Sequence, residues 1–141
     1  MRNPREIEKL YSKADVALVS SGIVIVQNNL PQPVIGEYEG YIAGLGATVI
    51  NMGIKPAIAA YCGNPPKDRK KPSRKRVIDA IAKTLMIEGA ENADALLKKV
   101  IDNENSLTKS EMKTLREDIV NASVALKILI RTYPINKDVD I

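Results

Sequence analysis

The sequence has no histidine, no tryptophan and no phenylalanine, and it contains one cysteine among 141 residues. Without histidine there are no imidazole ligands for zinc and no imidazole base for a Ser-His-Asp or Cys-His site. A single cysteine cannot form an internal disulfide, so Cys62 is expected to be a reduced thiol and a small core residue. We therefore expect no catalytic activity, no cofactor and no metal.

A long apolar segment is also missing. The longest uncharged stretch, Val16 to Gly36, contains two prolines and several polar residues, which makes it too polar to span a bilayer. The first twenty residues mix charges of both signs, from Arg5 to Asp15, which does not suit a signal peptide. These features predict a cytoplasmic protein that does not associate with membranes.

The length and composition are those of one globular domain. A chain of 141 residues can fill one hydrophobic core but not two. With 45% apolar and 27% charged residues, the composition is that of an ordinary folded protein. Residues 1–141 are therefore expected to form a single domain.

Positive charge is concentrated in the segment from Lys67 to Arg76, which we call the basic run. The run carries a charge of +6 and the rest of the chain a charge of −2, so the net charge of +4 is a local property. Its basic residues are Lys67, Arg69, Lys70, Lys71, Arg74, Lys75 and Arg76. Such a cluster repels itself unless an anion neutralises it, which favours a polyanionic partner. Because Phe and Trp are absent, we expect contacts with phosphates rather than stacking on bases.

Prolines bracket the basic run, which predicts a loop between two helices. Pro65 and Pro66 directly precede it and Pro72 lies within it. We therefore expect its basic residues to be replaceable without disturbing the core. Lys127 and Arg131, which are four residues apart in the last predicted helix, are like charges and are included among the expected nucleic-acid-binding residues.

Apolar residues recur at helical spacing through most of the chain. The expected helices are Glu6 to about Asn28 (with Gly22–Val26 as a continuation), Glu37–Met52, Lys55–Tyr61, about Ser73–Met86, Asn92–Ile101 and Thr108–Pro134. Thr108 and Glu111 form a capping box at the start of the last of these. No alternating strand with a hairpin turn is apparent. The fold class is therefore predicted to be all-α, a single-domain bundle of five to six helices.

The glycines in the apolar middle part of the sequence can be interpreted in two ways. Gly44-Leu-Gly46 begins like a dinucleotide-binding fingerprint, but the third glycine and the preceding strand are missing. We expect Gly40, Gly44 and Gly46 instead to lie on one helical surface that another helix approaches closely. Gly53 is expected to join two helices in a conformation with positive φ.

The segment 45–60, preceded by Tyr38 and Tyr41, resembles the small helical subunit, the fifth Cmr subunit, of the type III-B CRISPR effector complex. The positions that match this family are Leu45, Ile50, Gly53, Ile54, Ile58 and Ala59. Gly46 and Met52 stand where proline and asparagine are usual. Residues 118–131 are similar to the family's closing helix, with Arg131 at a basic position and Ile128 in place of the usual tryptophan. The resemblance covers about residues 37–62 and 111–133.

This resemblance implies a non-catalytic subunit that stacks with copies of itself and with the backbone subunit of the Cmr complex. Such a subunit lines the groove in which CRISPR RNA pairs with target RNA. The leading hypothesis is therefore an RNA-binding subunit of an antiviral complex. The alternative is a helical protein-interaction adaptor whose basic run docks an acidic protein partner.

Overall fold

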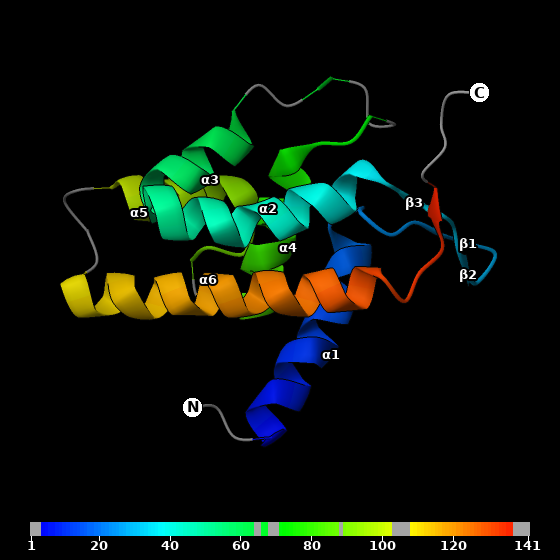
Figure 1. Ribbon diagram of the computed structural model, residues 1–141, viewed down its shortest axis with the longest axis horizontal. Helices are drawn as coiled ribbons and strands as arrows, with labels where there is room; N and C mark the ends of the chain where they lie inside the picture. Colours follow the sequence, from blue (N-terminus) through cyan, green and yellow to red (C-terminus); the bar gives the residue numbers. More distant parts are fainter. Residues whose placement is uncertain (1–3, 64–65, 68–70, 88, 103–107, 137–141) are drawn as a thin grey trace.

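The structure, a computed structural model, describes residues 4–63, 66–67, 71–87, 89–102 and 108–136 (Figure 1). Within these ranges the helices are α1 (Pro4–Ser20), α2 (Glu37–Met52), α3 (Ile54–Cys62), α4 (Arg74–Leu85), α5 (Ala93–Ile101) and α6 (Lys109–Ile130). Four two-residue strands are also present, β1 (Val26–Gln27), β2 (Leu30–Pro31), β3 (Val34–Ile35) and β4 (Ile135–Asn136). The expected helical bundle is confirmed.

Helix α4 is the central element and packs against each of the other five helices. Its apolar residues cover most of its circumference, and Val77, Ile78, Ala80, Ile81 and Ala82 are all buried. A helix that is apolar on most sides must be surrounded by other elements. Helix α1 packs against α4 and α6, whereas α3 and α5 pack against each other and against α4. The first turn of α4 is therefore held from several sides.

The first helix is shorter than the sequence pattern suggested. It ends at Ser20, and Gly22 follows with φ +84°, a left-handed conformation that ends helices. The prediction that Gly22–Val26 continues this helix is wrong. Ile23 and Val24 enter the core in a non-helical segment, so their burial accounts for the apolar run without a helix. Short apolar runs cannot be assigned to helix or strand by periodicity alone.

Two small sheets follow, and the expectation that no hairpin is present is wrong. Strands β1 and β2 form an antiparallel hairpin whose two-residue loop, Asn28-Asn29, has positive φ at both positions. That is the geometry of a type I′ turn, which asparagine tolerates better than other non-glycine residues. Strand β3 pairs in parallel with β4, so the chain after α6 lies beside the start of α2.

Gly53 joins α2 to α3 as predicted. Its φ of +89° and ψ of 168° lie in a region that only glycine adopts readily. The expectation that Gly40, Gly44 and Gly46 share one surface is wrong. A Cβ on Gly44 would lie 3.3 Å from the Tyr61 hydroxyl of α3, one on Gly46 would lie 3.1 Å from Ser123 Oγ of α6, and one on Gly40 would meet nothing within 4 Å.

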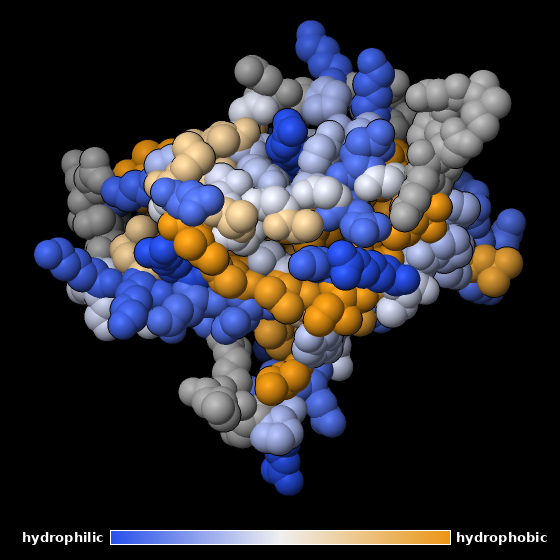
Figure 2. All heavy atoms as spheres, in the orientation of Figure 1, coloured by the Kyte–Doolittle hydropathy of each residue, from blue (hydrophilic) through white to orange (hydrophobic). Residues whose placement is uncertain are grey.

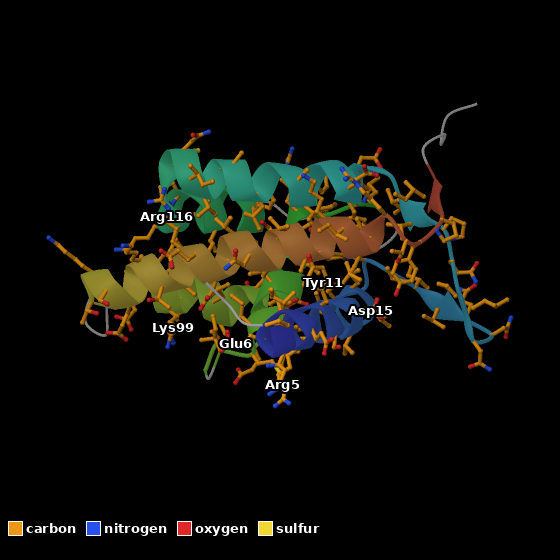
Figure 3. All side chains as sticks on the ribbon, turned by 60° about the horizontal axis from the view of Figure 1, so that its bottom comes forward. Arg5, Glu6, Tyr11, Asp15, Lys99 and Arg116 are labelled. Carbon is orange, nitrogen blue, oxygen red and sulfur yellow. The ribbon has the colours of Figure 1, made fainter. Side chains whose placement is uncertain are left out.

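Helix α6 begins at the predicted capping box. The Glu111 N–H donates to Thr108 Oγ1 over 3.1 Å and the Thr108 N–H donates to Glu111 Oε1 over 3.2 Å. These hydrogen bonds lower the pKa of Glu111. Arg116, farther along α6, donates from Nη2 to the carbonyl oxygen of Ile50 at the end of α2 (Figure 3). The two helices are thereby joined near the start of α6.

The sequence pattern predicted that the last helix ends at Pro134. Helix α6 ends four residues earlier, at Ile130. The Tyr133 hydroxyl then donates to Asp15 Oδ1 of α1 over 2.6 Å. This hydrogen bond, with a smaller effect of burial, raises the pKa of Tyr133 to about 12. Within the ranges given above, no helix is long and apolar enough to cross a membrane.

We predict that Gly53→Ala lowers the free energy of unfolding by about 1–3 kcal/mol, because alanine at this φ and ψ is strained. Urea titration measures the change. Gly40→Ala is the matched control, since this helical glycine has open space beside it, and we expect it to raise stability by about 0.5–1 kcal/mol. Equal effects of the two substitutions would contradict the assigned backbone conformation.

Candidate nucleic-acid interface

The basic run leads from α3 into α4. The structure describes Lys67 and Lys71, both exposed, and then Pro72 and Ser73, which precede the first turn of α4. Arg74, Lys75 and Arg76 form that first turn. Arg69 and Lys70, also predicted as binding residues, lie outside the described residues.

Tyr38 of α2 anchors the start of α4. Its side chain is only 1% exposed, and its hydroxyl oxygen accepts hydrogen bonds from the Ser73 N–H over 3.2 Å and from Arg76 Nη1 over 2.7 Å. Arg76 Nη1 also donates to the carbonyl oxygen of Lys71 over 3.2 Å. The expectation that all the basic residues can be replaced without affecting the core is therefore wrong for Arg76, which binds a buried group.

Arg74 points to a second tyrosine. Its guanidinium group lies over the ring of Tyr41, 4.7 Å from the ring centroid, in cation–π geometry. The ring of Tyr41 meets that of Tyr38 edge-on, with the centroids 6.0 Å apart. The Tyr61 hydroxyl of α3 donates to the carbonyl oxygen of Tyr41 over 2.7 Å. Burial raises the pKa of Tyr61, and the charge of Arg74 opposes this shift.

Two other predicted binding residues form ion pairs. Lys75 Nζ lies 2.8 Å from Asp94 Oδ1 of α5, and this hydrogen bond raises the pKa of Lys75. Arg131 Nε lies 3.5 Å from Glu39 Oε1 of α2. Both pairs are partly exposed, so each contributes little to stability and leaves part of its cation accessible to an anion.

Three of the predicted cations converge on the first two turns of α2. Arg76 reaches Tyr38, Arg131 reaches Glu39, and Arg74 reaches Tyr41. The structure thus brings Arg131 of α6 to the same helix end as the basic run, although 55 residues separate it from Arg76 in the sequence. Lys127 lies one turn before Arg131 on α6 and is half-buried.

The electrostatics of the first turn of α4 favour an anion. The N-terminal end of a helix carries a partial positive charge, and acidic residues usually offset it. Here the first turn contains three cations and no acidic residue. This arrangement is unfavourable for the helix alone and becomes favourable when a negative group binds there.

The sequence analysis did not place any tyrosine among the residues of the binding site. Tyr38, Tyr41 and Tyr61 are three of the five tyrosines in the chain, and all three lie beside the basic run. The spacing of three residues between Tyr38 and Tyr41 places them on one side of a helix, which was the available signal. Their contact with α4 depends on the packing of α2 against it, which spacing does not reveal.

The cysteine and the acidic side chains are the other groups that could react or bind a metal. Cys62 is buried, as expected, and burial raises the pKa of its thiol to about 11. Across the described ranges, no three side chains of Cys, Asp or Glu lie together as a metal site requires. Comparison with family models, with curated proteins and with solved structures gives no match to this chain.

We predict that Tyr38→Phe lowers the free energy of unfolding by about 1–3 kcal/mol, since it leaves the Ser73 N–H and the Arg76 guanidinium without a buried acceptor. Urea titration gives the value. Tyr11→Phe, on a half-buried tyrosine of α1, serves as the control and should change stability by less than about 0.5 kcal/mol. A loss no larger than that of the control would contradict the anchoring role of Tyr38.

We also predict that Cys62 reacts slowly with a disulfide reagent. A pKa of about 11 in place of the reference 9.0 lowers the thiolate fraction at pH 8 by about 100-fold. The native protein should therefore react at least about 100-fold more slowly than the protein unfolded in urea. Comparable rates in the two states would show that the thiol is activated rather than part of the core.

Proposed function

We propose that this chain is a non-catalytic RNA-binding subunit of a type III-B CRISPR effector complex and acts in antiviral defence. Its RNA partners are CRISPR RNA and the target RNA paired with it. Its protein partners are the backbone subunit of the Cmr complex and further copies of the chain itself. The protein neutralises phosphates and contributes helical surfaces for assembly.

The observation that carries the proposal is the set of cations around the junction of α2 and α4. Lys67, Lys71 and Arg74 are exposed, and Arg131 joins them at the start of α2. The first turn of α4 contains no acidic residue, and exposed cations in such a position are suited to bind a polyanion through its phosphates.

Several of the residues on which the family resemblance rests lie in the core, and they add support to the proposal. Leu45, Ile54 and Ile58 are buried, and Gly53 takes a conformation that requires glycine. These residues therefore have structural roles that a related helical subunit would share. Ile50, another matching position, is exposed and belongs to the surface.

An apolar surface on α6 and α1 supports assembly with other proteins. Figure 2 shows hydrophobic residues gathered over the C-terminal half of α6 and continuing onto α1. Val124 and Ile128 of α6 and Ile7 of α1 are each more than two-fifths exposed. A groove of about 510 Å³ between these helices is lined on one part by Ile7, Leu10, Tyr11 and Val124 and on the other by the polar residues Glu117, Asp118 and Asn121. Apolar surface of this kind usually contacts a protein partner.

We predict that replacing Lys67 and Lys71 together by glutamine weakens binding to single-stranded RNA and reduces its salt dependence. Each lost phosphate contact removes about 0.7 from the slope of log K against log salt, so the double variant should lose up to about 1.4. Fluorescence anisotropy at several salt concentrations measures both quantities. The melting temperature should be unchanged, because both side chains are exposed.

The control carries the same charge change elsewhere. Lys109→Gln with Lys113→Gln alters two exposed lysines at the other end of α6 from Arg131 and should leave affinity and slope unchanged. If wild type and both variants bind RNA equally, or if wild type binds no RNA, the proposal fails. Capture of an acidic protein through the basic run would then favour the adaptor.

A further inference from the structure

A small pocket lies between the end of α3 and the start of α4, directly beside the basic run. Its volume is about 90 Å³, enough for several water molecules or a compact anion and too small for a nucleoside. Among the described residues, those that line it are Tyr41, Ala60, Tyr61, Gly63, Pro66, Pro72, Ser73 and Arg74. None of these residues is acidic.

The hydroxyl group of Ser73 is the unusual feature of this pocket. Ser73 is only 7% exposed and occupies the N-cap position of α4, yet its side chain makes no capping hydrogen bond. An N-cap serine ordinarily accepts a hydrogen bond from the first turn. Among the described residues the hydroxyl has no hydrogen-bond partner, although the backbone N–H of Ser73 is bound to Tyr38. Because no buried side-chain oxygen among the described residues lacks a partner, the Ser73 hydroxyl is open to the pocket, where a ligand can bind it in place of water.

The other walls of the pocket are suited to negative charge. Arg74 is the first residue of the 12-residue helix α4 and lines the pocket, so the partial positive charge at the start of this helix lies beside it. The stacking of Arg74 on Tyr41 limits the positions of the guanidinium group. The positive end of α4 and the Arg74 guanidinium group therefore lie beside the pocket that the Ser73 hydroxyl group also lines.

We propose that this pocket binds one phosphate group. The Ser73 hydroxyl and the N–H groups at the start of α4 donate to its oxygens, and Arg74 supplies the charge-assisted hydrogen bonds. This assignment differs from general neutralisation by the basic run, because it specifies one phosphate at one position. It places Ser73, a buried and uncharged residue, among the binding residues.

The source of the phosphate group rests on the proposed function. If the chain binds RNA, the group is a phosphate of that strand, either at its 5′ end or within it. A free phosphate ion offers the same chemistry. Separate titrations with inorganic phosphate and with RNA distinguish these two sources.

The test is a titration of the ¹⁵N-labelled chain with inorganic phosphate at constant ionic strength, using chloride to compensate. We expect saturable shifts that are largest at the amides of Arg74 and Lys75. Ser73→Ala and Arg74→Gln should each weaken phosphate binding by roughly tenfold, the effect expected for losing one hydrogen bond to a charged group. Lys113→Gln, a charge change on α6, is the control and should bind like wild type.

Folding provides a second control. Since the Ser73 hydroxyl has no partner to lose, Ser73→Ala should unfold at the same temperature as wild type in phosphate-free buffer. Phosphate should raise the melting temperature of wild type but not that of Ser73→Ala. Shifts that are spread over all lysines, or that are equal in wild type and Ser73→Ala, would overturn the proposal.

The same variants are then tested with single-stranded RNA carrying a 5′-phosphate or a 5′-hydroxyl group. Weaker binding by Ser73→Ala to both RNAs assigns the site to an internal phosphate, and a loss confined to the 5′-phosphorylated RNA assigns it to the strand end. Equal RNA binding by wild type and Ser73→Ala, with no response to inorganic phosphate, overturns the pocket and leaves the proposed function standing. If the chain binds inorganic phosphate at Arg74 but binds no RNA, the pocket is a site for a free phosphate ion. That result overturns the proposed function.

Discussion

The buried hydroxyl of Tyr38 joins the first turn of α2 to the start of α4, and the position of the basic residues depends on this contact. It accepts from the backbone of Ser73 and from the guanidinium of Arg76, so one oxygen atom determines where α4 begins and how Arg76 lies. Because α4 packs against every other helix, its first turn cannot move independently of the bundle. The cations that follow Pro72 are therefore held by the core rather than by a flexible loop.

This constraint divides the basic run into two kinds of residue. Arg76 and Lys75 are bound to Tyr38 and Asp94, and they position the start of α4. Lys67, Lys71 and Arg74 remain exposed to a ligand, with Arg74 stacked on Tyr41. The positive end of the α4 dipole adds to their charge. A surface of this kind suits phosphate groups irrespective of base sequence, which is what the proposed function requires.

The helices could be predicted from the sequence where a local signal marked their ends. The Thr108–Glu111 capping box and Gly53 are such signals, and both were confirmed. The end of α1 could not be predicted, because Ile23 and Val24 are apolar for burial in a non-helical segment rather than for a helical face. The Asn28-Asn29 turn lacks the glycine that usually marks a hairpin. For the site, the local charge density was visible in the sequence, but the contacts of Tyr38, Tyr41 and Glu39 with residues 33 to 92 positions away arise only from packing.

Crosslinking of RNA to the protein purified from its native cells is the decisive measurement for RNA binding, because it identifies both the ligand and the residues that touch it. If the chain binds RNA as proposed, RNA copurifies with it and crosslinked nucleotides map to residues 66–76 and to the first two turns of α2, with Tyr41 among them. Absence of RNA, or crosslinks confined to α1 and the β1–β2 hairpin, would contradict the proposal.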